Sequence, residues 1–256
     1  MIRRDRRASE GALYRTLRPG TGGCNPGGEV TGCEAGRKRS HLGDMNLFDL
    51  RREYENRPLH RRDLAPDPLV QFERWFLEAR EHVALDPNAM CLSTVGSDGR
   101  PSARMVLLKS YDANGFVFFT NLESRKAREI EGNPHVCLLF FWAPLSRQVV
   151  IEGRAERVST AEAMAYFLTR PRGSQIGAWV SEQSRPISSR AVLEAKWEEL
   201  KRKFGEGQIP LPSFWGGYRV RPVRYEFWQG RENRLHDRFE YVADGAGGWR
   251  IERLQP

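Results

Sequence analysis

Beginning at residue 67, the apolar positions of the chain recur at helical spacing. Asp67 and Pro68 fit an N-cap residue followed by proline at the first helical position. The apolar residues behind them lie three or four positions apart, at Leu69, Phe72, Phe76 and Ala79. This spacing predicts a helix that begins at residue 68.

After residue 87 the pattern changes to short stretches rich in β-branched and aromatic residues, which are typical of strands. We expect strands over residues 89–95, 102–109, 116–120, 135–142, 148–158, 218–228, 239–242 and 249–253. Residues 97–99 contain Asp-Gly, residues 112–115 contain Asn-Gly, and residues 230–233 form a polar link. These links predict tight turns between neighbouring antiparallel strands.

Helices are predicted in the gaps between these strands. Residues 124–131 precede a Gly-Asn-Pro stop, and residues 159–162 fit a capping box that opens a helix ending at Pro171. A short helix or turn is expected over 178–184 and a longer amphipathic helix over 188–204. The fold class is therefore α+β, mainly β: an antiparallel β-barrel with peripheral helices. Missing βαβ units argue against a Rossmann fold.

Composition divides the chain near residue 45. The 256 residues carry a net charge of +8, with 39% hydrophobic and 29% charged residues. Residues 1–44 hold nine Lys/Arg, five Asp/Glu, nine of the 24 glycines and a single aromatic residue, Tyr14. Such a segment buries too little to offset its ordering entropy, so we expect a disordered tail over 1–44. The alternatives are a transit peptide and a nucleic-acid-binding arm.

The cysteines and the apolar runs bear on the cellular compartment. The longest nearly apolar run, 136–145, has ten residues, whereas a membrane helix needs about twenty. The expected protein therefore has no membrane span, and without an apolar h-region it has no signal peptide. Four cysteines without a C-x-x-C pair favour neither a disulfide framework nor a zinc site. We expect a cytoplasmic protein without a metal.

Candidate chemistry begins at two predicted element ends. Arg104 and Lys109 bracket a strand, and their spacing of five places them on opposite faces of a regular strand. They can meet one ligand only if the strand bends or the ligand wraps its end; otherwise they are solvated. Ser124, Arg125 and Lys126 open a helix, where free N–H groups and two cations suit a phosphate. The alternative is a solvated first turn, but cations there oppose the helix dipole.

A second possible phosphate site lies on the capped helix. Tyr166 and Arg170 are four residues apart and share a face, and Ser174 follows the break at Pro171. Their hydroxyl and guanidinium groups could converge on a phosphate. The alternative is an ordinary amphipathic helix face.

The densest polar segment covers residues 226–238. Arg234, His236 and Arg238 alternate, so they would point to one side of an extended segment. Three potential cations on one face repel each other unless anions or ring acceptors lie opposite, which predicts a ligand site. Common catalytic motifs such as G-x-S-x-G, H-E-x-x-H, the P-loop and G-x-G-x-x-G are missing from the sequence.

Several motifs in order resemble those of the pyridoxine/pyridoxamine 5′-phosphate oxidase family, over residues 50–256. They are Arg-Met-Val-Leu-Leu-Lys at 104–109, Ser-Arg-Lys at 124–126, Arg-Pro-Arg-Gly-Ser-Gln-Ile-Gly-Ala-Trp at 170–179, Pro-Ser-Phe-Trp-Gly-Gly at 212–217, Glu-Phe-Trp-Gln at 226–229 and Arg-Leu-His-Asp-Arg at 234–238. A single motif would be a weak signal, but this series is specific.

The resemblance implies a homodimeric split β-barrel of the FMN-binding type, with FMN in clefts at the subunit interface. The FMN-binding residues that it implies are Arg104, Met105, Val106, Leu107, Leu108, Lys109, Phe119, Thr120, Arg125, Lys126, Gln148, Gln183, Ser184, Trp228 and Arg238. The implied substrate-binding residues are Arg51, Tyr54, Lys109, Tyr166, Arg170, Ser174, Arg234, Leu235 and His236. Arg234 and His236 are the expected catalytic residues, which orient the reacting end of the pyridine ring.

The resemblance also implies the domain organisation and the reaction. Residues 45–66 are expected to close over the substrate, and residues 67–256 to form the FMN-binding split-barrel domain. The implied reaction oxidises pyridoxamine or pyridoxine 5′-phosphate to pyridoxal 5′-phosphate by hydride transfer to FMN, and dioxygen becomes hydrogen peroxide.

Three alternatives stay open at this point. A flavin reductase of the same fold would not need the second phosphate site, and a non-catalytic flavin or pyridoxal phosphate carrier would produce no peroxide. Nucleic-acid binding is suggested by charge alone, and half of that charge lies in residues 1–44. We expect no nucleic-acid partner.

Overall fold

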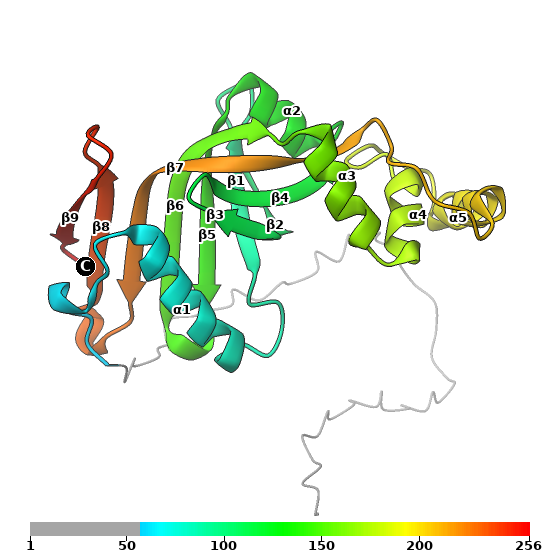
Figure 1. Ribbon diagram of the computed structural model, residues 1–256. Helices are drawn as coiled ribbons and strands as arrows, with labels where there is room; N and C mark the ends of the chain where they lie inside the picture. Colours follow the sequence, from blue (N-terminus) through cyan, green and yellow to red (C-terminus); the bar gives the residue numbers. More distant parts are fainter. Residues whose placement is uncertain (1–56) are drawn as a thin grey trace, which may run out of the picture. The chain divides into compact units, whose positions relative to one another are not determined.

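Residues 57–256 are the part of the chain that the structure, a computed structural model, describes (Figure 1). They form a nine-stranded sheet with the path β2-β1-β5-β6-β7-β4-β3, while β8 pairs with β7 and β9. The strands are β1 (Ala89–Val95), β2 (Pro101–Leu107), β3 (Ser110–Asp112), β4 (Gly115–Asn121), β5 (His135–Trp142), β6 (Arg147–Arg157), β7 (Trp215–Gln229), β8 (Asp237–Ala243) and β9 (Trp249–Leu254). The paired strands are all antiparallel, as expected for this fold class.

Five α-helices lie in the described part of the chain, namely α1 (Pro68–His82), α2 (Arg125–Gly132), α3 (Thr160–Thr169), α4 (Arg172–Val180) and α5 (Arg190–Phe204). The prediction for α1 is confirmed down to its cap, because the Asp67 side chain accepts a 2.7 Å hydrogen bond from the Leu69 amide. None of these helices is long and apolar enough to cross a membrane.

One helix prediction was wrong. We expected a short helix or turn over 178–184, but the helix here is α4, which begins at Arg172 and has ended by Ser181, and a turn closed by the Arg185 amide and the Glu182 carbonyl follows it. Pro171 ends α3, as predicted, but it also serves as the N-cap residue of α4 with φ −53°. Proline with a fixed φ is compatible with a helix start, so the chain enters a new helix at once. Ser174 consequently lies in the first turn of a helix.

Strand β7 is the longest strand of the sheet, and it runs from the side of β8 and β9 to the side of α3 (Figure 1). One edge of β7 pairs with β6, and the other pairs first with β4 and then with β8. The register with β6 shifts between Glu152 and Gly153. A Cβ atom on Gly153 would lie 2.3 Å from the Arg221 carbonyl oxygen, so only glycine permits this close approach.

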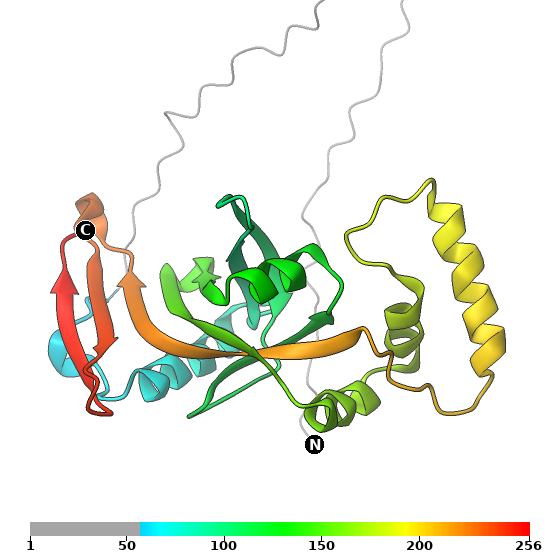
Figure 2. The same ribbon diagram turned by 90° about the horizontal axis from the view of Figure 1, so that it is seen from above.

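The main core lies between the curled sheet and α1, which runs along one face of the sheet (Figures 1 and 2). Phe72 of α1 is fully buried and makes edge contacts with Phe116 and Phe140 from two different strands. Trp75, one turn later, packs edge-on against Phe227 of β7 at 5.3 Å. These contacts fix the sheet's curvature around α1 and thereby place the outer strands.

A second core cluster lies at the opposite end of β7 from β8 and β9, among α3, α4 and α5 (Figure 2). Trp215, the first residue of β7, packs against Phe167 of α3 at 5.2 Å. Trp197 of α5 lies against α4, within 3.7 Å of the Cβ positions of Gly173 and Gly177. Glycine at both positions lets the two helices approach closely. This cluster forms one wall of the site described next.

Candidate active site

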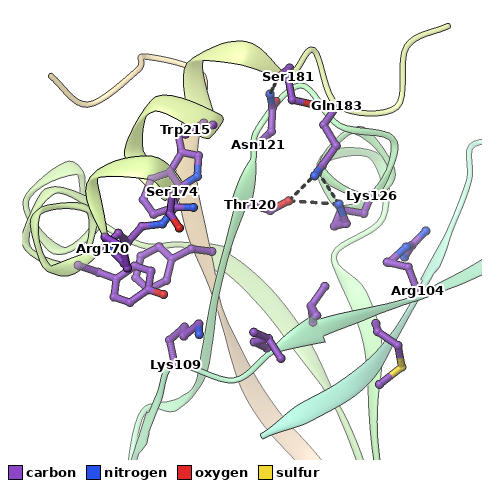
Figure 3. Close-up of a pocket in the computed structure, with 18 of the residues that line it drawn as sticks. Arg104, Lys109, Thr120, Asn121, Lys126, Arg170, Ser174, Ser181, Gln183 and Trp215 are labelled. Carbon is purple, nitrogen blue, oxygen red and sulfur yellow. Dashed lines mark hydrogen bonds between the residues drawn. The ribbon is translucent and has the colours of Figure 1, made fainter. Parts of the chain in front are cut away.

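A cavity of about 810 Å³ opens between the strands β2 and β4 and the helices α3 and α4 (Figure 3). Its lining includes twelve of the residues predicted for cofactor or substrate, namely Arg104, Met105, Val106, Leu107, Lys109, Phe119, Thr120, Lys126, Tyr166, Arg170, Ser174 and Gln183. The structure thus brings residues from five distant segments of the sequence to one place.

Lys126 forms the first cationic group of this cavity. Its Nζ atom donates hydrogen bonds to Gln183 Oε1 at 2.7 Å and Thr120 Oγ1 at 3.2 Å (Figure 3), and contacts Ser124 Oγ at 3.5 Å. These three oxygen atoms are all uncharged. Burial, together with the nearby Arg104 guanidinium, lowers the pKa of Lys126 to about 8, against the opposing effect of Glu129. A buried cation with neutral partners at a helix start is a suitable site for a phosphate.

Glu129 organises the arginines beside Lys126. Its carboxylate is 8% exposed and accepts hydrogen bonds from Thr94 and Ser102 and from the guanidinium groups of Arg104 and Arg125. Burial by itself would raise the pKa of Glu129, but these hydrogen bonds lower it to about 2. Arg104 is therefore held at the cavity edge, whereas the Arg125 side chain is 62% exposed and does not line the cavity.

Arg170 forms the second cationic group. Its guanidinium carbon lies 4.9 Å from the ring centre of Trp215, and its Nη1 atom is buried with no hydrogen-bond partner. Burial lowers the pKa of Arg170, although Tyr166 opposes this shift. Ser174 lies beside Arg170 in Figure 3. An unsatisfied buried guanidinium nitrogen that borders a cavity is costly unless an anion binds it.

Stacked aromatic rings line the cavity beside Arg170. Phe119 of β4 stacks on Tyr166 with a centroid distance of 4.2 Å and lies parallel to Trp215 at 5.4 Å. Lys109 Nζ lies 5.9 Å from the centre of the Tyr166 ring. Strand β2 ends at Leu107, before Lys109, so a regular strand does not hold Arg104 and Lys109 on opposite faces. Both side chains line the same cavity.

The other predicted residues form a second group on the sheet. Gln148, Trp228 and Arg238 are direct cross-strand neighbours on β6, β7 and β8, so their side chains lie on one face of the sheet. The Trp228 ring lies 4.6 Å from that of His236. Leu235 and His236 line a separate cavity of about 330 Å³ with the C-terminal residues. We call Gln148, Trp228, Arg238 and His236 the outer group.

We expected Arg234, His236 and Arg238 to point to one side if their segment is extended, and this condition is not met. Glu232–Arg234 form a 3-10 turn, in which Asn233 and Arg234 have φ of 54° and 62°. Arg234, His236 and Arg238 therefore do not point to one side as an alternating strand would. The Arg231 amide donates a 3.0 Å hydrogen bond to His236 Nδ1, which leaves the proton of a neutral ring on Nε2. Burial and the adjacent Arg234 lower the pKa of His236, which favours this neutral form.

One chain does not bring the cavity and the outer group together. Trp215 in the cavity and Trp228 in the outer group are both on β7, and the 13 steps from one residue to the other correspond to about 40 Å along a strand at ~3.3 Å per residue. Two further residues lie outside the cavity: Leu108 is buried in the main core, and Ser184 lines a neighbouring cavity. Arg51 and Tyr54 lie outside the described residues.

The cavity also contains residues that the sequence reasoning did not single out, namely Asn121, Thr169, Pro171, Gly177, Ala178, Ser181 and Trp215. Asn121 donates a 3.2 Å hydrogen bond to the Ser181 carbonyl and so links β4 to the chain after α4. Trp215 stands in the motif at 212–217, which was the available signal for it. Pro171, Gly177 and Ala178 stand in the motif at 170–179, so a signal of the same kind was available for them.

The fold and the cavity together define the class of protein. The structure matches a PhzG structure from Burkholderia lata in complex with tetrahydrophenazine-1-carboxylic acid, with a TM-score of 0.73 and 30% identity over 78% of this chain and 99% of that one. A pyridoxamine 5′-phosphate oxidase-related, FMN-binding protein from Nostoc punctiforme shares the fold, with a TM-score of 0.61 at 15% identity over 75% of this chain. The class is that of the split-barrel flavoproteins.

Sequence comparison then gives the family. Residues 77–204 match the family model described as pyridoxamine 5′-phosphate oxidase, and residues 215–256 match the pyridoxine 5′-phosphate oxidase C-terminal dimerisation region. The chain belongs to the pyridoxamine 5′-phosphate oxidase family. A pyridoxine/pyridoxamine 5′-phosphate oxidase from Rippkaea orientalis is 59% identical over 83% of this chain and all of its own length. The corresponding protein from Escherichia coli O9:H4 is 58% identical over 83% of this chain and 97% of its own.

Proposed function

We propose that this protein oxidises pyridoxamine and pyridoxine 5′-phosphates to pyridoxal 5′-phosphate, with FMN as hydride acceptor and dioxygen reduced to hydrogen peroxide. The observation that carries the proposal is a single cavity with two separate cationic groups, at Lys126 and at Arg170, and stacked aromatic rings in its wall. Two phosphorylated ring compounds that must meet face to face need this arrangement. The names of the 58–60% identical relatives support the same reaction.

The Lys126 side of the cavity suits the FMN phosphate. Lys126 provides a buried ammonium group, and Arg104 lies at the cavity edge, where it donates a hydrogen bond to Glu129. Helix α2 begins at the same place, with free backbone N–H groups in its first turn. Arg125 would reach a phosphate only by turning from its 2.8 Å contact with Glu129. When bound, FMN supplies the hydride acceptor, and the residues of this chain supply binding and orientation.

The Arg170 side suits the phosphate of the substrate. The unpartnered Nη1 of Arg170, the Tyr166 hydroxyl and the Ser174 hydroxyl are the groups available for it. Lys109 lies between this group and β2, where it can contact either ligand. Holding the phosphate fixes the distance of the pyridine ring from the flavin, which is the main requirement for hydride transfer.

The outer group completes the site from the partner subunit in a homodimer. The C-terminal segment matched as a dimerisation region, 215–256, contains Trp228, Arg238 and His236. A two-fold axis repeats each contact, so two chains would form two identical sites, each with one chain's cavity and the other chain's outer group. Arg234 and the Nε2–H of His236 would then orient the reacting end of the pyridine ring.

Three parts of this account stay predictions. The covering role predicted for residues 45–66 falls mainly on residues outside the described part of the chain, whereas Leu59 and Leu64 of its described part are buried in the core. The passive role of residues 1–44 also lies outside the described residues. A cytoplasmic location is consistent with Cys91 and Cys137, which are free thiols in the structure.

One assay tests the reaction. The purified protein is mixed with pyridoxamine 5′-phosphate in air, and aldehyde and hydrogen peroxide are measured together with the flavin released on denaturation. We expect stoichiometric aldehyde and peroxide and about one FMN per chain. A flavin reductase would form no aldehyde, and a carrier would form neither product.

A further inference from the structure

The carboxylate of Glu226 lies between two arginines on the outer face of the sheet. Its Oε1 accepts a 2.8 Å hydrogen bond from Arg238 Nε, and its Oε2 accepts one of 3.1 Å from Arg224 Nη2. The Glu226 side chain is only 10% exposed, whereas Arg238 is 30% exposed. Glu226 precedes Trp228 by two residues on β7, so both side chains lie on the same face as Arg238.

Arg238 has a second anchor at the end of the chain. Its Nη1 donates a 2.9 Å hydrogen bond to the Gln255 carbonyl oxygen. The two anchors hold the guanidinium by two of its three nitrogens and fix its plane, because the donors of an arginine lie in a rigid fork. The direction in which the remaining nitrogen points is thereby determined before any ligand arrives.

Glu226 is itself held in place. Arg224, its other partner, also pairs with Glu152 at 2.7 Å and Glu240 at 2.8 Å, so three carboxylates surround this arginine. Arg224 does not touch Arg238 in these contacts; the link between them runs through Glu226. Glu226 contacts both arginines, whereas Glu152 and Glu240 contact Arg224. Variants at these glutamates can therefore separate effects on Arg238 from effects on the charge network as a whole.

We propose that Glu226 is a positioning residue for the flavin site: it orients Arg238 so that each subunit presents a preformed guanidinium to the cavity of its partner. This inference rests on the proposed function, in which Arg238 contacts FMN bound by the other chain. Without Glu226, Arg238 would sample several rotamers and lose part of its binding free energy on ordering.

The test measures FMN affinity of the flavin-free dimer by quenching of flavin fluorescence. Glu226→Gln keeps the shape but removes the charge that aligns Arg238, and we expect about fivefold weaker FMN binding, the difference between a charge-assisted and a neutral hydrogen bond. Glu240→Gln is the matched control, because it removes a carboxylate from the same Arg224 but not from Arg238. We expect it to change FMN affinity less than about twofold.

A double-mutant cycle separates positioning from a general structural role. In an Arg238→Ala background, Glu226→Gln should no longer weaken FMN binding, since the residue through which it acts is gone. An equal loss in both backgrounds, or no loss in the wild-type background, would overturn the inference. Should Glu226→Gln fail to fold, Glu226→Asp takes its place, because the shorter side chain withdraws the carboxylate from Arg238 Nε, and the same pattern is required of it.

Failure of the inference and failure of the proposed function give different results. A wild-type protein that does not bind FMN contradicts the proposed function. Wild-type binding with an Arg238→Ala variant of unchanged affinity contradicts the placement of Arg238, and the role of Glu226 falls with it. Normal wild-type binding, a weakened Arg238→Ala variant and an unaffected Glu226→Gln variant contradict the inference about Glu226 alone.

Discussion

Lys126 Nζ donates a 2.7 Å hydrogen bond to Oε1 of Gln183, 57 residues further along the chain (Figure 3). This contact joins the first turn of α2 to the segment that follows α4, across the cavity. The position of the ammonium group therefore depends on tertiary structure at both ends. In the proposed function, the binding of the FMN phosphate depends most on this group.

The first prediction concerns the charge of Lys126. Its pKa of about 8 means that the free protein loses this cation as the pH rises through 8. A bound phosphate favours the charged form, so FMN affinity should fall between pH 7 and pH 9, whereas riboflavin affinity should not. Fluorescence titrations of both flavins measure this difference.

Lys126→Arg is the control for this pH dependence, because arginine stays charged throughout the range. It should remove the fall in FMN affinity that appears between pH 7 and 9. Lys126→Met should weaken FMN by about ten- to a hundredfold with little effect on riboflavin. A wild-type pH profile identical for the two flavins would contradict the role of Lys126.

The second prediction concerns stability in acid. Glu129 has a folded-state pKa of about 2, below its ordinary value of 4.5, so it contributes stability above pH 4.5 that is lost as the pH falls towards 2. Glu129→Gln should lower the free energy of unfolding by about 2 kcal/mol at pH 7 and flatten its dependence on pH below 4.5. Urea unfolding at several pH values measures both effects.

Glu131→Gln is the matched control on the same helix. Its side chain is 48% exposed and accepts hydrogen bonds from Arg157 and Tyr218, away from the cavity. We expect a loss below about 1 kcal/mol for this variant. Equal losses in the free energy of unfolding for the two variants would show that the buried hydrogen bonds of Glu129 contribute no more than the exposed ones of Glu131.

The third prediction concerns the substrate phosphate. Arg170→Ala removes the guanidinium whose Nη1 is unsatisfied, and should weaken binding of pyridoxamine 5′-phosphate by about ten- to a hundredfold. The rate of flavin reduction at saturating substrate should change less, because the phosphate is remote from the reacting carbon. Anaerobic single-turnover reduction against substrate concentration gives both quantities.

The control for Arg170 is Arg172→Ala, two residues away. Arg172 donates hydrogen bonds to the carbonyl oxygens of Phe204, Gly205 and Gly207 at the end of α5 and does not line the cavity. Its loss should leave substrate affinity within about twofold of wild type. An unchanged affinity in Arg170→Ala would mean that the substrate phosphate binds elsewhere.

The fourth prediction concerns the reacting end of the substrate. Arg234→Ala and His236→Ala should slow flavin reduction at saturating substrate, because hydride transfer depends on the alignment of the two rings. Substrate affinity should fall less than in Arg170→Ala. If both kinds of variant change only affinity, the division between anchoring and orienting residues is wrong.

The sequence was sufficient where local signals decide the structure. β1 and β5 begin and end where the alternation predicted, and the Asp67 cap and Pro68 define the start of α1. α4 was misplaced because a proline that stops one helix can also start the next. A turn was predicted over residues 230–233, but its continuation through Arg234 was missed because left-handed backbone at arginine carries no sequence signal of its own.

In the candidate site, too, some residues were placed correctly from the sequence and others were not. The motifs placed Lys126, Arg170 and their neighbours in one cavity, since each lies near an element end that the pattern located. The separation of Arg238 and Trp228 from that cavity could not be predicted from spacing. It depends on the course of β7, whose partners β4, β6 and β8 are distant in sequence.

The central claim is that each active site combines the cavity of one chain with the outer group of the other, and mixing two impaired variants tests it directly. Arg170→Ala damages the cavity and Arg238→Ala damages the outer group. After the two dimers exchange subunits, half of the dimers are mixed, and each mixed dimer contains one site with both halves intact. The account predicts recovery of about one quarter of the wild-type pyridoxamine 5′-phosphate oxidase activity at low substrate concentration. Activity that stays at the average of the two variants, although subunit exchange is demonstrated, would contradict it.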